Sequence, residues 1–184
     1  MKYTECAEIE DIPLELLDEP LNWFFAEHYR HRQLCRMIDE VAVAVVFDAE
    51  RIAKIVDFLR YDLPLHVIDE EEDLFPLLRR RSLPEDELDQ VLGVLSAEHK
   101  ADIDHARAVR SLLEASLEAR AAPGLDGAKR KALNDFAAQE RHHLALENAV
   151  VLPIARLRLS EEDLAGMSRR LAARRGRLVE SETP

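Results

Sequence analysis

The sequence has little glycine, cysteine or aromatic residue content. Five of its 184 residues are glycine, and 5% are aromatic. Long stretches are instead rich in Ala, Leu, Glu and Arg, which have high helix propensity, so the composition predicts helices rather than sheets. A chain of this length with 47% hydrophobic residues can build one well-buried core and is short for two domains.

The two cysteines, Cys6 and Cys35, form no CxxC motif. The chain also begins without a positively charged region followed by an apolar run, as a secretory signal would require. We therefore expect a cytoplasmic protein with reduced thiols. Cys35 falls on an apolar helical stripe, where a cysteine is usually a small apolar residue of the core.

Long hydrophobic runs and an excess of positive charge are also absent. No segment approaches the roughly 18 uninterrupted apolar residues that a membrane span requires. Acidic residues outnumber basic ones by 37 to 25, which argues against nucleic acid or an anionic membrane as the main partner. A basic run near the C-terminus is the exception, and we interpret it as a solvated, partly frayed helix end. It comprises Arg169, Arg170, Arg174, Arg175 and Arg177.

One pattern of histidine, glutamate and proline occurs twice. Residues 66–76 and 143–153 each read His-x3-Glu followed by a proline six positions after the glutamate. A histidine and a glutamate four residues apart lie one above the other on a helix, so each copy offers an imidazole and a carboxylate to the same neighbour. An Ala-Glu-His triplet precedes each copy and ends at His28 or His99. The order His, then His-x3-Glu, therefore occurs twice.

This repetition predicts a site in which four histidines and two glutamates close around two metal ions. The candidate metal ligands are His28, His66, Glu70, His99, His143 and Glu147. All six lie on apolar stripes, and burial of charged groups without compensation costs several kcal/mol per group. Metal coordination explains why a core would tolerate them.

Apolar residues recur at helical spacing over four long segments, residues 20–47, 49–80, 82–120 and 128–157. Short turns between them predict an all-α fold, an antiparallel up-and-down four-helix bundle over residues 20–157. Residues 1–19 are interpreted as an extended lead-in, and residues 158–184 as a short extra C-terminal helix and tail.

Local signals refine this prediction. Pro64 and Pro76 interrupt the second segment, so we expect a kink or a restart just before His66. Ser82 and Glu85 have the spacing of a capping box that would open the third segment. The stripe around His28 includes both Phe24 and Phe25.

The other polar candidates are weaker. His31 lies one turn after His28 at the edge of the stripe, so a ligand role stays open. His105 is interpreted as a surface residue, and His142 lacks a carboxylate four residues later. Asp62 precedes His66 by four residues and could orient its imidazole, although Pro64 disturbs the turn between them.

As a set, these motifs resemble the hemerythrin-like, or HHE cation-binding, domains over about residues 20–157. The resemblance rests on Glu-His at 27–28 and 98–99 and on the two His-x3-Glu copies with their following prolines. It implies a non-heme di-iron centre with four terminal imidazoles and two bridging carboxylates. The implied terminal ligands are His28, His66, His99 and His143, and the implied bridges are Glu70 and Glu147. Imidazole and carboxylate donors also suit Mn or Zn, so ligand softness alone does not select iron.

The sequence departs from the oxygen carriers of that family. Their third helix has two histidines four apart, whereas Ile103 follows His99 here, and their fourth helix uses a later aspartate, whereas Glu147 follows His143 by four. The missing imidazole leaves more coordination positions for other ligands and argues against stable oxygen transport.

Three functions remain open at this point. We expect oxygen or iron sensing, or iron handling, with O2, peroxide or nitric oxide as the small ligand. A di-iron enzyme that reduces peroxide or nitric oxide is the alternative. A helical interaction module that keeps the pattern without using metal is the third. No feature of the sequence names a protein partner.

Overall fold

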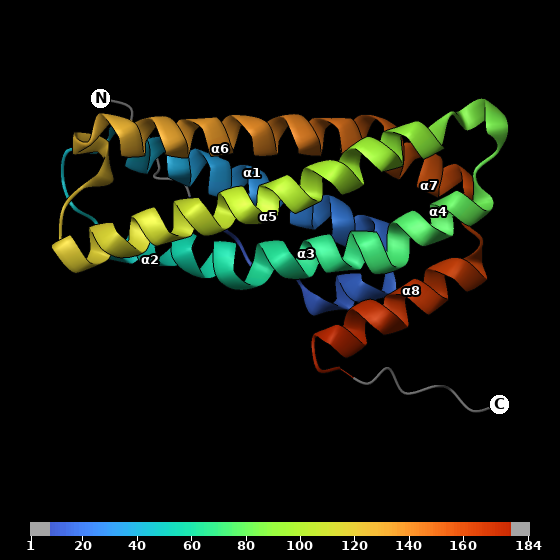
Figure 1. Cartoon of the computed structure of the whole chain (residues 1–184). Helices are drawn as coiled ribbons and strands as arrows, with labels where there is room; N and C mark the ends of the chain where they lie inside the picture. The colour runs from blue at the N-terminus through green and yellow to red at the C-terminus, as the bar shows by residue number, and fades with distance from the viewer. Residues whose placement is uncertain (1–7, 178–184) are drawn as a thin grey trace, which may run out of the picture.

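The computed structural model describes residues 8–177, and these form an all-α bundle, as the sequence predicts (Figure 1). The first of its four long helical runs is α1 (Pro20–Val43), and the third is α5 (Leu88–Ala119). The second run consists of α2 (Ala49–Asp57), η2 (Phe58–Asp62), α3 (Leu63–Asp69), η3 (Glu70–Leu74) and α4 (Phe75–Arg81). The fourth consists of α6 (Gly127–Leu146), η6 (Glu147–Val151) and α7 (Leu152–Arg158). Helix α1 packs against both α2 and α6. Helix α5 also packs against these two helices, so the four runs enclose one core.

Turns of π-helix interrupt the second and fourth runs at η2, η3 and η6. Each ends two residues before a proline, at Pro64, Pro76 and Pro153 respectively. Proline lacks an N–H, and its ring clashes with the carbonyl four residues earlier, so a wider turn lets the helix continue past it. The sequence predicts a kink or a restart of the helix just before His66. The structure instead has a continuous helix with π turns there. Two of these turns begin at Glu70 and Glu147.

The core consists of two apolar clusters, one toward each end of the bundle. One includes Leu34 of α1 and Val109 of α5, and the other includes Phe24 of α1 and Leu95 of α5. Each long run therefore passes from one cluster to the other. Buried polar residues occupy the stretch between them on all four runs, and His28 on α1 is one of these. The fold thus places a polar layer inside an otherwise apolar core.

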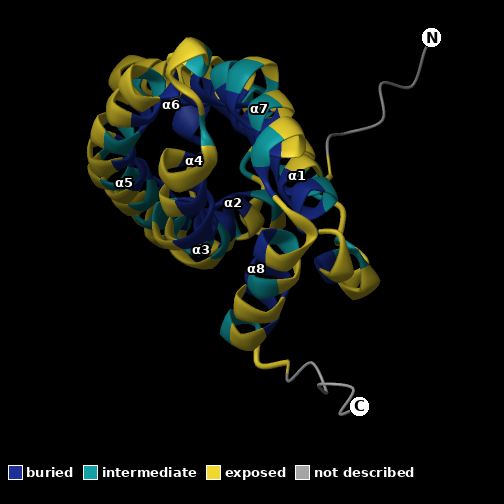
Figure 2. Ribbon diagram, turned by 90° about the vertical axis from the view of Figure 1, so that its right-hand side faces the viewer, coloured by how far each residue is buried: buried dark blue, intermediate teal, exposed yellow. Residues whose placement is uncertain are grey.

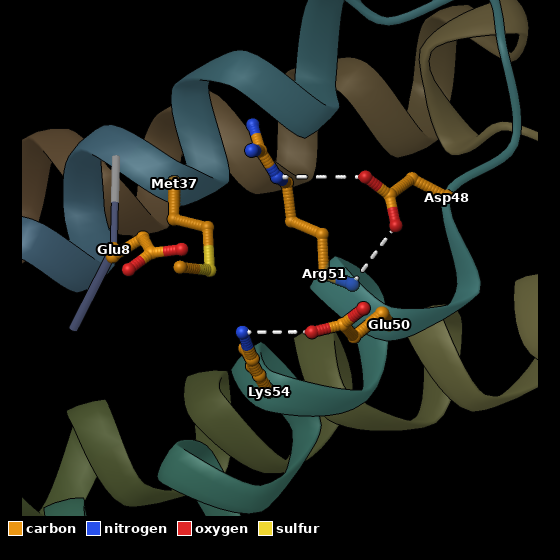
Figure 3. Close-up of a pocket in the computed structure, with 6 residues that line it drawn as sticks. All are labelled: Glu8, Met37, Asp48, Glu50, Arg51 and Lys54. Carbon is orange, nitrogen blue, oxygen red and sulfur yellow. Dashed lines mark hydrogen bonds and ion pairs between the residues drawn. The ribbon is translucent and has the colours of Figure 1, made fainter. Parts of the chain in front are cut away.

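Local polar contacts mark the beginning of α2, which follows the turn after α1 (Figure 3). Asp48 caps α2, because its carboxylate accepts a hydrogen bond from the backbone N–H of Arg51 at 3.1 Å. One turn later, Lys54 pairs with Glu50 at 3.0 Å. These residues line a surface cavity of about 170 Å³ that contains none of the six candidate ligands.

The structure corrects three local expectations. The lead-in is not wholly extended, because η1 (Leu14–Asp18) is a turn of 3-10 helix. The third run begins at Leu88 rather than near Ser82, since Glu87 takes a left-handed conformation at φ 49° and the backbone N–H of Leu83 donates to Asp86. Phe25 is 55% exposed and does not belong to the core.

The final helix, α8 (Glu161–Arg174), lies outside the ring of the four runs, beside α1 and α3 (Figure 2). A capping box opens it, because Ser160 Oγ accepts from the N–H of Asp163 and the Asp163 carboxylate accepts from the N–H of Ser160. Its buried face, which includes Met167 and Leu171, packs against η1 and α1. Within residues 8–177, no helix is both long and apolar enough to cross a membrane.

Candidate metal centre

Each of the four runs contributes a histidine to the polar layer, and two of them also contribute a glutamate. His28 lies on α1, His66 on α3, His99 on α5 and His143 on α6, while Glu70 and Glu147 are the first residues of η3 and η6. All six residues are at most 5% exposed. The structure therefore brings together every residue that the sequence singled out as a candidate ligand.

The first half-site consists of His28 and His66 facing one oxygen of each glutamate. Nε2 of His28 lies 3.5 Å from Glu70 Oε1 and 3.5 Å from Glu147 Oε2. Nε2 of His66 lies 3.6 Å from the same oxygen of Glu70. These four residues form a group that could hold a metal ion.

The second half-site consists of His99 and His143 facing the other two oxygens. Nε2 of His99 lies 3.2 Å from Glu70 Oε2, and Nε2 of His143 lies 3.1 Å from Glu147 Oε1. The two Nε2 atoms are 3.0 Å apart. These residues form a second group that could hold a metal ion, and it shares both glutamates with the first.

The spacing of these atoms fits metal coordination. Donor atoms at about 2.0 to 2.2 Å from one ion are separated by about 3 to 3.6 Å from their neighbours. Most of the observed separations, 3.0 to 3.6 Å, lie in this range, and that between Nε2 of His99 and Glu147 Oε1 is slightly longer at 3.8 Å. Because Glu70 and Glu147 each direct one oxygen into each half-site, both carboxylates are placed to bridge two ions.

Six of the donor atoms described above are left without hydrogen-bond partners. Within the described residues, this holds for Nε2 of His28 and His66 and for both carboxylate oxygens of Glu70 and Glu147. A buried polar atom without a partner costs about 1 to 3 kcal/mol, and more when it is charged, so such atoms are rare in folded proteins. Six of them around one space fit a bound cation.

A second set of polar residues holds the other nitrogen, Nδ1, of each histidine. These contacts fix which nitrogen of the ring faces the centre. The pairs are His28 with Asn148 (3.1 Å), His66 with Glu27 (3.1 Å), His99 with Glu71 (2.7 Å) and His143 with Glu98 (3.0 Å).

Sequence reasoning missed this supporting set, although the repeat contains a signal for it. Glu27 and Glu98 directly precede a candidate ligand, and Glu71 and Asn148 directly follow one. Each supports a histidine on a different helix, so the pairing follows the twofold repeat of the motif. Asp62, which the sequence offered as a weak candidate to orient His66, pairs with Arg30 at 2.8 Å.

The electrostatics of the metal-free site favour charged side chains. Burial by itself lowers the pKa of His66, but Glu70 and Glu27 outweigh it and raise that pKa to about 10. Burial likewise lowers the pKa of His143, but the contact with Glu147 outweighs burial and raises that pKa to about 10. Burial raises the pKa of Glu70, but His66 and its neighbours hold that pKa well below its usual range. A cation that enters must therefore displace protons from the imidazoles.

The other histidines lie outside the two ligand groups. His31 is buried and contacts Glu140 through Nδ1 at 2.6 Å, and its ring centre is 4.5 Å from that of His66. Burial, with the nearby charge of His66, lowers the pKa of His31. His105 is partly exposed, and His142 is exposed.

Cys35 lies in one of the two apolar clusters and is completely buried. Burial raises the pKa of its thiol, which disfavours the thiolate that would bind a metal. Cys35 is also absent from both ligand groups. The donor set of the centre therefore consists of imidazoles and carboxylates.

A helical bundle with two adjoining groups of histidine and glutamate is the architecture of a protein that can hold a pair of cations in its core. The family model of the hemerythrin HHE cation-binding domain matches residues 19–155, most of the chain. The protein belongs to this family. Among curated proteins, no relative matches the chain.

Proposed function

We propose that this protein is a non-heme di-iron protein that binds O2, peroxide or nitric oxide and serves in oxygen or iron sensing or in iron handling. One observation carries the proposal. Both carboxylates direct one unpartnered oxygen into each half-site, where the Nε2 atoms of two imidazoles also point. In this proposal all six candidate ligands bind metal, and Glu70 and Glu147 bridge the ions.

The donor set is compatible with iron. Imidazole and carboxylate ligands without thiolate suit Fe and also Mn and Zn, and the family resemblance favours iron among these. Each half-site offers two imidazole nitrogens and two carboxylate oxygens. Iron usually accepts more donors than this, so positions remain for a small ligand. Bound iron would supply those open positions and a redox couple, which is the chemistry that O2, peroxide and nitric oxide require.

The surrounding residues keep bulk water out of the centre. Phe75 stacks on the ring of His99 with centroids 5.6 Å apart, and Phe24 lies 6.1 Å from the ring of His66. Both phenylalanines are completely buried. An apolar wall around a metal site lowers its local dielectric constant and controls the access of solvent and ligand.

Metal analysis combined with an absorption spectrum tests this proposal. Freshly purified protein is expected to contain two iron ions per chain and an oxo-bridged iron absorption that disappears with dithionite and returns with O2. The variant His99→Ala should lose one iron, whereas the matched control His142→Ala, which changes an exposed histidine, should keep both. If the purified protein contains no iron and also fails to bind ferrous iron under anaerobic conditions, the result would support a helical interaction module that does not use metal.

A second candidate, a di-iron enzyme that reduces peroxide or nitric oxide, is favoured by the buried pair of His31 and Glu140. This pair touches the ring of His66 and could hold a proton close to the centre. If it supplies protons, Glu140→Gln should slow peroxide turnover by the reduced protein while leaving its iron content unchanged. No turnover by the wild-type protein would remove this candidate.

A further inference from the structure

The sequence predicts that the basic C-terminal run is a solvated helix end, and the structure confirms this only in part. Arg169, Arg170 and Arg177 are exposed, whereas Arg174 and Arg175 are partly buried. Three of its arginines extend from α8 toward buried acids on the second run. Asp69 is fully buried and Asp73 is 1% exposed. Arg174 pairs with both of these aspartates, and Arg170 pairs with Asp73. The arginines therefore pair with one acid just before the π turn that begins at Glu70 and with one acid inside it.

Arg175 continues this contact to the metal centre itself. Its guanidinium donates to Glu27 Oε1 at 2.9 Å, and the other oxygen of Glu27 meets Nδ1 of His66 at 3.1 Å. It also donates to Asp69, the neighbour of Glu70, at 2.7 Å. The guanidinium lies over the ring of Trp23, 4.6 Å from its centroid, which fixes it further. A chain of polar contacts thus runs from the end of α8 to a candidate ligand.

Within the described residues, the second half-site has no arginine in an equivalent place, although the buried Asp102 lies 3.9 Å from Nδ1 of His143. Its two supporting acids, Glu71 and Glu98, have side chains that are 32% and 33% exposed, against 7% for Glu27. Neither is paired with an arginine or a lysine within residues 8–177. Solvent can reach both carboxylates, and Glu71 also accepts a hydrogen bond from Ser96 Oγ at 3.0 Å. Their contacts to the imidazoles therefore do not depend on a charged partner.

We propose that α8 is a clamp for the first half-site, that Arg175 is its positioning residue, and that metal binding and docking of α8 stabilise each other. The inference rests on the metal centre proposed above. A bound ion would fix His66 and Glu70. Fixing His66 holds its partner Glu27 in reach of Arg175, and fixing Glu70 holds the adjacent Asp69 in reach of Arg174 and Arg175. By linkage, a docked α8 must then raise the affinity of that half-site by the same factor.

Loss of Arg175 leaves Glu27 and Asp69 with less compensation for their buried charge. Both acids are then expected to shift toward solvent, and Glu27 no longer holds the ring of His66 in place. Changes to groups that orient a metal ligand typically weaken metal binding by about 10- to 100-fold. We expect Arg175→Gln to fall near the lower end of this range, because Arg174 still pairs with Asp69.

Affinity measurements on one half-site at a time test the clamp. Ferrous iron is titrated without oxygen, against a competing chelator, in two backgrounds. His99→Ala leaves only the first half-site intact, and His28→Ala leaves only the second. Arg175→Gln should weaken binding about tenfold in the first background and leave it unchanged in the second. Arg175→Lys should restore part of the loss, and Arg169→Gln, which changes an exposed arginine of the same helix, should have no effect.

Hydrogen exchange tests the reverse direction, and its main comparison uses the wild-type protein alone. Backbone amides of residues 161–174 should exchange several-fold more slowly with ferrous iron than without it. The protection should persist in His99→Ala and vanish in His28→Ala. Circular dichroism of each variant separates loss of the clamp from loss of the fold.

The outcomes separate this inference from the proposed function. Wild-type protein that binds two irons, with equal exchange of α8 in both forms and no effect of Arg175→Gln, overturns the clamp and leaves the di-iron proposal intact. Wild-type protein that binds no iron overturns the di-iron proposal and the clamp with it. Equal weakening of both half-sites by Arg175→Gln would assign α8 a general structural role and contradict the clamp.

Discussion

The two halves of the candidate centre have the same set of candidate ligands but different surroundings. Each has two imidazoles, shares the same two carboxylates and uses an acid that precedes a histidine as a support. The support of the first half, Glu27, is buried and held by Arg175, whereas that of the second, Glu98, is one-third exposed. The difference arises because α8 packs on one side of the bundle only (Figure 2). A repeat in sequence therefore need not give two equivalent metal positions.

Removal of metal should have the largest effect, since it empties both halves at once. At a metal concentration 1,000-fold above the dissociation constant, a site present only in the folded state adds about 4 kcal/mol to the free energy of unfolding. For a chain of this size, loss of that stabilisation when metal is removed should lower the thermal midpoint by roughly 8 to 16 °C per site. Calorimetry of iron-loaded and chelator-treated protein measures the shift. Equal midpoints would mean that neither half holds metal in the folded protein.

A change at a shared carboxylate should affect both halves, and a change at one histidine should affect one. Glu147→Ala is expected to weaken binding of both ions by more than about 100-fold, since a change to a supporting residue alone costs up to that factor. His28→Ala should weaken one ion only. Iron content after dialysis against a weak chelator distinguishes the two cases. Retention of one tightly bound iron by Glu147→Ala would show that this glutamate does not bridge.

The supporting acids should differ in importance. Glu27→Gln is expected to weaken the first half about 10- to 100-fold, because a buried amide cannot replace a carboxylate that holds both His66 and Arg175. Glu98→Gln should have a smaller effect on the second half, since water reaches this side chain. Parallel titrations with ferrous iron compare the two variants. Equal losses would contradict the inequality of the two halves.

A change in pH should act on both halves alike. The pKa values of His66 and His143, one from each half, are both raised to about 10, so metal must displace a proton in each. Affinity should therefore rise about tenfold per pH unit for each proton released, over the range below pH 10. Isothermal titration in buffers of different ionisation enthalpy counts the protons. No proton release near pH 7 would contradict the raised pKa values.

The metal-free protein should show the opposite trend with pH. Histidines whose pKa is raised on folding add stability that is complete below the unfolded pKa of about 6.5 and is lost as pH rises toward 10. Glu70, whose pKa is lowered, adds stability that is lost when pH falls below its usual value. Urea denaturation of the metal-free protein at several pH values should thus find greatest stability in mildly acidic solution.

Helical periodicity was sufficient to predict the fold and the convergence of the six candidate ligands. Their burial follows from their position on apolar stripes, as for His66 and Glu70 on the second run. That they bind metal stays a prediction. The π turns were only partly predictable, because proline signals a disturbance of the helix without showing that the helix will widen rather than break.

The supporting set could not be predicted in the same way. Glu27 is adjacent to His28 in sequence yet orients His66, a contact that depends on how α1 and α3 pack. The arginines of α8 were misjudged for a related reason. A charged run on a short helix is normally solvated, and nothing in the sequence shows that α8 lies against the buried acids Asp69 and Asp73.

Anomalous scattering from crystals of the iron-loaded protein, recorded on both sides of the iron absorption edge, tests the central claim most directly. We predict two iron peaks inside the bundle, one between His28 and His66 and one between His99 and His143, with Glu70 and Glu147 contacting both. A single peak, peaks outside this layer, or none in protein that has been exposed to ferrous iron would contradict the account.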